Sequence, residues 1–212
     1  MHIRQITFNV FQENTYILWD HTNDCIIIDP GCYEKREKEI LVNFIESNNL
    51  NPVKLINTHC HIDHILGNKF VSEKWDLELY MHQLDLPLLE GAGMIAKNYG
   101  FELYEGSPYP KHFLEGGDIL EFGNSKLEII FAPGHAPGHI CLLNKEDDFI
   151  VSGDVLFNGS IGRTDLPGGD FDTLINSIRS KLLILNDDLK VYSGHGPSTT
   201  IGKEKLTNPF LS

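Results

Sequence analysis

The sequence is short of basic residues. Its 212 residues include 17 Lys and Arg against 30 Asp and Glu, which gives a formal net charge of −13. No cluster of basic residues offsets this deficit, and a surface rich in carboxylates repels phosphates. The composition therefore excludes general binding to nucleic acid or to anionic membranes.

Long apolar runs are missing as well. No segment approaches the roughly 18 apolar residues of a membrane-spanning helix, and the first residues lack the apolar region and cleavage site of a signal peptide. With 41% hydrophobic residues, the chain can still bury a sizeable core. The sequence predicts a soluble cytoplasmic protein with a single domain over residues 1–212.

Cysteine is scarce and is not arranged for disulfides. The four cysteines show neither CxxC spacing nor the density of a secreted disulfide scaffold, which predicts reduced thiols. Cys60 lies between two histidines, but in an extended segment its side chain points away from theirs. We expect Cys60 to pack as a small hydrophobic residue rather than to bind metal or act as a nucleophile.

Short β-branched and aromatic segments separated by turn residues predict two groups of strands. The first group covers residues 3–10, 15–19, 24–29, 53–57 and 78–81, and the second covers 118–122, 126–131, 140–143, 149–152 and 190–193. Apolar residues at helical spacing predict helices over 34–48, 65–75, 83–97 (interrupted by Pro87) and 171–183, with a short terminal helix from Glu204. This order indicates two similar halves, each a sheet with helices outside.

The strongest chemical signal is the segment Thr58-His59-Cys60-His61-Ile62-Asp63-His64. Neutral imidazoles and carboxylates are the ligands that zinc or iron prefers. The segment follows an apolar run at 53–56, so we place it at the carboxyl end of a strand, where open α/β sheets commonly bind ligands. The sequence predicts a metal site here.

Three further metal-type residues follow predicted strands. His135 lies between two proline-glycine pairs, Asp154 follows Gly153, and His195 follows Gly194. Taken alone, an aspartate after glycine is more often a turn residue and a single histidine more often lies on the surface. Because the pattern of strand, glycine and ligand recurs, we expect these residues to converge on the rim that carries the first cluster.

These motifs together resemble the metallo-β-lactamase superfamily, and most closely its glyoxalase II-like branch of short hydroxyacylglutathione hydrolase-type proteins. The matching segments are residues 29–31 (DPG), 59–64 (HxHxDH), 133–135 (PGH), 153–154 (GD), 162–169 (GRTDLPGG) and 194–197 (GHGP). The resemblance implies an α/β fold, a four-layer αββα sandwich of two mixed β-sheets with helices on the outer faces. This fold matches the two halves inferred above.

The resemblance also implies a ligand set for two divalent metal ions, with zinc expected and iron or manganese as alternatives. By position, the first ion is held by His59, His61 and His135, the second by Asp63, His64 and His195, and Asp154 bridges them. A hydroxide bridging the ions would attack the carbonyl of a small acyl thioester such as an S-2-hydroxyacylglutathione. Asp63 and Asp154 are accordingly the predicted catalytic residues.

Two residues outside the ligand set are expected to orient it. Asp29 either holds a ligand loop or forms a structural turn at a strand end. His139, four residues after His135, is expected to hydrogen-bond to a ligand rather than to bind metal.

Substrate contacts are less defined. Arg163 either pairs with Asp165 or touches substrate, and we favour the pair because arginines that lose solvent need a carboxylate. Lys203 and Lys205 either meet a substrate carboxylate or are simply solvated. Longer glyoxalase II enzymes carry a C-terminal helical region that contacts glutathione, which we do not expect in this chain, so the thiol of the substrate stays open.

Two alternative functions remain. A persulfide dioxygenase shares the segment 162–165 and resembles a mononuclear iron enzyme, although this chain retains the residues of a second metal site. A non-catalytic metal-binding module would bind metal without turnover. A nuclease would need a basic substrate track, which the sequence lacks.

Overall fold

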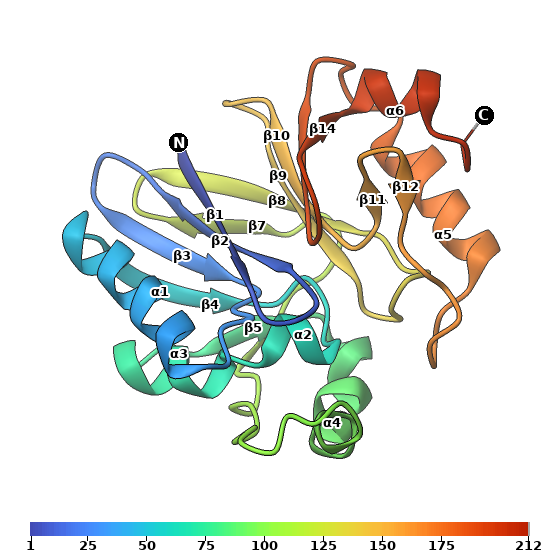
Figure 1. Cartoon of the computed structure of the whole chain (residues 1–212). Helices are drawn as coiled ribbons and strands as arrows, with labels where there is room; N and C mark the ends of the chain where they lie inside the picture. The colour runs from blue at the N-terminus through green and yellow to red at the C-terminus, as the bar shows by residue number, and fades with distance from the viewer. Residues whose placement is uncertain (212) are drawn as a thin grey trace. The chain divides into compact units, whose positions relative to one another are not determined.

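The computed structural model describes residues 1–211, which cluster into two compact units. The first unit holds Met1–Phe113 and Glu121–Lys126, and the second holds Leu114–Leu120 and the chain from Leu127 onward. Each unit is built on a mixed sheet of strands (Figure 1). Each sheet has six strands, and each unit has an apolar core of its own. The sheets confirm the predicted fold class, while the single domain stays a prediction.

The first sheet has the order β1-β2-β3-β4-β5-β6. Its strands are β1 (His2–Phe8), β2 (Glu13–Trp19), β3 (Asp24–Ile28), β4 (Asn51–Ile56), β5 (Leu79–Met81) and β6 (His112–Phe113). Strands β1 to β3 form an antiparallel meander, and β3 to β6 run parallel. Because Ile28 pairs with Ile56, β3 and β4 end side by side, and the residues that follow them meet at one edge of the sheet.

Helices pack on this sheet through an apolar core that joins Leu41, Ile45 and Val71 to Ile27 and Leu55. They are α1 (Lys35–Ser47), α2 (Ile62–Ile65), α3 (Asn68–Trp75) and α4 (Leu86–Asn98), the last preceded by a 3-10 turn at Gln83–Asp85. The predicted interruption at Pro87 is wrong. Pro87 stands in the first turn of α4, where the missing N–H costs no hydrogen bond, so it begins the helix.

The second sheet has the order β14-β13-β10-β9-β8-β7. Its strands are β7 (Ile119–Phe122), β8 (Ser125–Phe131), β9 (Ile140–Asn144), β10 (Phe149–Gly153), β13 (Lys190–Ser193) and β14 (Thr199–Thr200), and β11 (Leu156–Phe157) pairs with β12 (Ser160–Ile161) in a separate hairpin. Helix α5 (Phe171–Ser177) continues as a π-helix over Ile178–Leu182, and α6 spans Ile201–Thr207. Leu174, Ile178 and Ile201 share a core with Ile150 and Val191 of the sheet.

Within residues 1–211, none of the helices combines the length and apolar character needed to cross a bilayer.

Candidate metal centre

In the first unit, Asp29 joins the ends of two parallel strands. Its backbone N–H donates to the carbonyl of Ile56 (2.9 Å), the residue that ends β4. Asp29 has a left-handed φ of 50°, which aspartate tolerates better than most residues. Its carboxylate accepts hydrogen bonds from the backbone N–H (2.7 Å) and hydroxyl (2.5 Å) of Thr58. The start of the histidine segment is therefore held against the end of β3.

This contact also sets the tautomer of His59. The Thr58 hydroxyl has one proton, which it donates to Asp29, so it can only accept from Nδ1 of His59 at 3.1 Å. A protonated Nδ1 leaves Nε2 with its lone pair, the form of histidine that binds a metal ion. The rings of His59 and His61 lie edge to face with centroids 4.8 Å apart.

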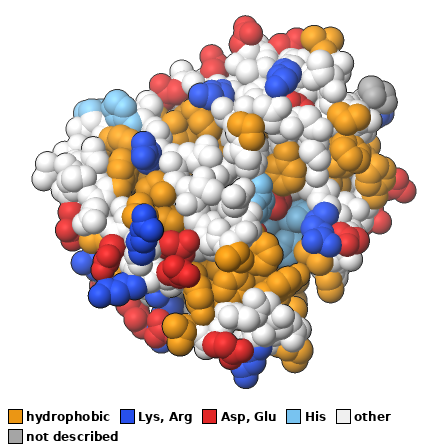
Figure 2. Space-filling view, viewed as in Figure 1, with side chains coloured by type: hydrophobic (Ala, Val, Ile, Leu, Met, Phe, Trp, Pro, Cys, Tyr) orange, Lys and Arg blue, Asp and Glu red, His pale blue; other side chains and the backbone are white. Residues whose placement is uncertain are grey.

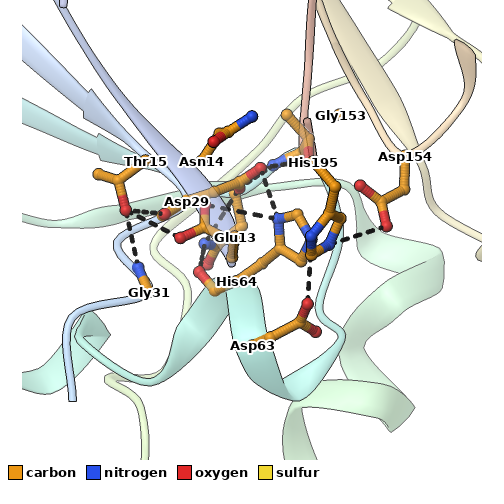
Figure 3. Close-up of polar contacts among 12 residues, drawn as sticks. Glu13, Asn14, Thr15, Asp29, Gly31, Asp63, His64, Gly153, Asp154 and His195 are labelled. Atoms are coloured by element: carbon orange, nitrogen blue, oxygen red, sulfur yellow. Dashed lines mark hydrogen bonds and ion pairs between the residues drawn. The ribbon is translucent and has the colours of Figure 1, made fainter. Parts of the chain in front are cut away.

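His64, on α2, is a buried imidazole surrounded by carboxylates (Figure 3). Its Nδ1 lies 3.1 Å from Oδ2 of Asp29 and 3.9 Å from Oε1 of Glu13. Its Nε2 lies 3.7 Å from Oδ2 of Asp63. Potential ligand atoms of Asp29, His59 and His64 lie within 4.8 Å of one another. The carboxylates of Asp29 and Asp63 on either side of one imidazole carry negative charge that a cation would offset.

Glu13 was not predicted as part of the site, because residue 13 falls between the predicted strands at 3–10 and 15–19. It begins β2 and is fully buried, and burial raises the pKa of its carboxyl well above the usual range. Oε2 accepts from the hydroxyl of Thr15 (3.0 Å). The Glu13 carboxyl group can occupy this position only because residue 31 is glycine, since a Cβ there would lie 2.1 Å from Oε2. The signal in the sequence was an acidic residue directly before an apolar strand.

In the second unit, strand register brings three predicted residues to one edge. Strands β10 and β13 are parallel and pair Gly153 with Ser193, so Asp154 and His195 follow neighbouring strand ends. Strands β8 and β9 are antiparallel and are joined by the turn that holds His135. Because β9 also runs antiparallel to β10, that turn lies at the edge where β10 ends.

The distances within this group fit a shared metal ion. Nε2 of His135 and Nε2 of His195 each lie 3.5 Å from Oδ2 of Asp154 (Figure 3 shows the His195 pair). For ligand bonds of about 2.0–2.1 Å around a tetrahedral ion, neighbouring ligand atoms are about 3.4 Å apart. The imidazole and carboxylate donors are also those that zinc and iron take, so these residues fit a divalent metal.

Two buried contacts orient this group. Nδ1 of His135 donates to the carbonyl of Arg163 (2.7 Å), because a carbonyl oxygen can only accept, and Nε2 of His135 is left as the ligand atom. The backbone N–H of Asp154 donates to Nε2 of His139 (3.0 Å). His139 thus uses that nitrogen to hold the residue expected to bridge the metals.

The remaining predicted residues make local contacts. Arg163 forms two hydrogen bonds with Asp165 (2.7 and 2.6 Å), which confirms the favoured pair, and this pairing lowers the pKa of the Asp165 carboxyl to about 2. Lys203 donates to the side chain of Asn158 (2.8 Å), and Lys205 pairs with Asp187.

Cys60 packs in the core as predicted. It is buried, and its sulfur lies 3.7 Å from that of Met81.

Each unit therefore brings its own share of the predicted ligands together. The first collects His59, His61, Asp63 and His64, and the second collects His135, Asp154 and His195. Histidine and aspartate groups at the ends of strands in two mixed sheets define a metal-binding α/β protein. The chain belongs to the metallo-β-lactamase superfamily, whose family model matches residues 8–195.

Curated relatives resemble the chain over its whole length. Hydroxyacylglutathione hydrolase GloC of Haemophilus influenzae is 40% identical over 213 residues, covering 100% of this chain and 99% of the relative. The probable metallo-hydrolase YqgX of Bacillus subtilis is 40% identical over 217 residues, covering 100% and 98%. This chain is accordingly a metallo-hydrolase of the superfamily.

Two solved structures are similar in fold and sequence. The BLEG-1 B3 metallo-β-lactamase has a TM-score of 0.88 and 34% identity, with 100% of both chains covered. TTHA1623, crystallised in a di-iron-bound form, has a TM-score of 0.88 and 39% identity, with 98% of this chain and 100% of that chain covered.

Proposed function

We propose that the protein hydrolyses acyl thioesters of the hydroxyacylglutathione type with two divalent metal ions, most simply zinc. The ligands we assign are His59, His61 and His135 for one ion, Asp63, His64 and His195 for the other, and Asp154 for both. When bound, the metal ions supply a water with a pKa near neutrality and polarise the carbonyl of the substrate. The observation that carries the proposal is this donor set in a chain 40% identical to a hydroxyacylglutathione hydrolase.

The chain's own residues contribute orientation. Asp29 holds His64 directly and His59 through Thr58, so one carboxylate fixes two ligand tautomers. The Arg163 carbonyl does the same for His135. Rigid ligands keep the attacking water and the carbonyl at reacting distance, where positioning lowers the barrier most.

A thioester suits a site whose acids and bases are already ligands. The leaving thiol has a pKa of about 8.5 and departs as an anion, so no strong general acid is needed. Asp63 and Asp154 act through the metal ions in this scheme. An amide substrate, in contrast, would demand a proton for its leaving nitrogen.

The test is a substrate panel with purified protein of measured metal content. It compares thiol release from S-lactoylglutathione and from simpler acyl thioesters, opening of a β-lactam, and oxygen uptake with glutathione persulfide. The β-lactam is included because a 34% identical structure is a metallo-β-lactamase. We expect thioester cleavage to be fastest by at least about tenfold, a difference of about 1.4 kcal/mol in barrier.

Other results of this substrate panel would indicate a different function. One iron per chain with oxygen consumed would replace the hydrolase by a mononuclear dioxygenase. Metal bound without turnover of any substrate would leave a metal-binding module.

A further inference from the structure

The first unit carries an apolar pocket beside α4 that the metal site does not use. It is an open hollow of about 340 Å³, lined by Gly93, Met94, Lys97, Phe101, Glu102 and Tyr104 among others. Its charged lining residues are one lysine and one glutamate, so the lining carries no net charge. Hydrophobic side chains gather on the surface over the β1–β2 turn and α4 (Figure 2). Met94 and Tyr99 are 73% and 51% exposed, and such apolar patches commonly mark binding sites.

A chain of contacts joins this pocket to the metal ligands. The side chain of Asn9 donates to the backbone carbonyl of Asp63 (3.0 Å), and its Oδ1 accepts from the backbone N–H of Phe11 (3.0 Å). The ring of Phe11 lies 5.3 Å from that of Tyr99 and 5.9 Å from that of Phe101, which lines the pocket. Asn9 and the ring of Phe11 therefore connect the backbone at Asp63 to the pocket.

Helix α4 carries a glycine beside the pocket, which leaves the pocket open but lowers the stability of the helix. Gly93 lies on its exposed face, and a glycine inside a helix costs roughly 1 kcal/mol relative to alanine. No steric need explains it, since a Cβ at Gly93 would meet nothing within 4 Å. Gly91 is equally open but does not line the pocket, and nothing in the structure explains it.

We propose that this pocket binds the uncharged, apolar end of the acyl group, so that the preferred substrates are thioesters with medium-length hydrocarbon chains. The inference rests on the proposed function. Burial of each additional methylene increases binding about fourfold. An octanoyl thioester should then exceed the acetyl thioester of the same thiol in kcat/KM by at least about tenfold.

The test fills the pocket without disturbing the helix. Gly93→Leu places a side chain in the pocket, and Gly91→Leu makes the same change two residues away. Both should preserve the thermal midpoint or raise it. We expect Gly93→Leu to lose at least about tenfold in kcat/KM for octanoyl with little change for acetyl, and Gly91→Leu to match the wild type. No preference for octanoyl, or equal losses in both variants, would overturn the proposal.

A second measurement separates this inference from the proposed function. The probe is the S-octyl thioether of the same thiol, which lacks the carbonyl and cannot be hydrolysed. Calorimetry measures its dissociation constant, and comparing the three proteins shows how much the pocket contributes to binding. If no thioester is cleaved, the proposed function fails, but tighter binding of the thioether by wild type and Gly91→Leu than by Gly93→Leu still supports the pocket. Equal binding by all three proteins, or none, would overturn it.

Discussion

Asp29 illustrates how much of the site depends on a single carboxylate. It accepts both donors of Thr58 and lies 3.1 Å from Nδ1 of His64. In Asp29→Asn, one oxygen becomes an NH₂ group that faces donors and cannot accept from them. We expect zinc affinity to fall by about ten- to a hundredfold, measured by competition with a chromogenic chelator. Asp188→Asn, at an exposed position, is the matched control, and equal affinity for both variants would contradict this role.

Asp20 gives a prediction about pH and stability. Burial opposes ionisation of its carboxylate, but hydrogen bonds from Thr22, Asn124 and Ser125 outweigh that effect and hold the pKa well below its usual range. A carboxyl with a depressed folded-state pKa stabilises the fold above its unfolded pKa of about 3.9, and this stability is lost as the pH falls.

The variant Asp20→Asn should therefore cost about 1.5–3 kcal/mol of unfolding free energy at pH 7. The difference in unfolding free energy between the wild type and the variant should be about 1 kcal/mol smaller at pH 3, because Asp20 of the unfolded wild type then takes up a proton. Urea titrations at the two pH values measure both differences. A difference that widens on acidification would be inconsistent with the depressed pKa.

Residues inside a local motif could be predicted from the sequence, whereas residues that act at long range could not. The HxHxDH segment and the glycine-flanked Asp154 and His195 are visible because their spacing is written within a few residues. Asn9 reaches Asp63 across 54 residues, and no local pattern indicates that contact. The convergence of all seven predicted ligands remains part of the proposal.

At the scale of elements, two glycines predict opposite effects of one substitution. A Cβ at Gly162 would lie 2.0 Å from the backbone oxygen of Asp154 and 3.0 Å from Nδ1 of His135, so the loop after β12 must shift. We expect Gly162→Ala to destabilise the protein by about 1–3 kcal/mol. Gly91→Ala adds a methyl in open space on α4 and should stabilise it by about 0.5–1 kcal/mol. Chemical denaturation measures the unfolding free energy of both variants. Changes of the same sign would contradict the opposite steric surroundings described for the two glycines.

The periodicity of apolar residues predicted the long helices and strands but not the short ones. The main strands and α1 lie within a few residues of their predicted ranges because their apolar patterns run through several turns or pleats. Strands β6, β11, β12 and β14 contain two residues each, too few to carry a pattern, and exist because a neighbouring strand pairs with them. The break of the 171–183 helix into a π-helix after Ser177 likewise left no local signal.

At the scale of the whole molecule, metal removal should weaken the fold. The ligand carboxylates of Asp63 and Asp154 lack a compensating cation once the metal is gone, in a chain whose net charge is already −13. Binding at about a thousandfold excess over Kd contributes about 4 kcal/mol. For a protein of this size, we expect a strong chelator to lower Tm by about 10 °C.

Calorimetric scans before chelation, after chelation and after zinc is restored check this expectation. A reversible shift supports resident metal in the folded protein. An unchanged Tm would count against it.

The most direct test of the central claim is a zinc titration of metal-free protein followed by thiol release from an acyl thioester. If ligands from both units hold two ions, activity should rise until two zinc ions are bound per chain, and it should be lost in His61→Ala. Full activity with a single zinc ion, or activity that survives His61→Ala, would contradict the account.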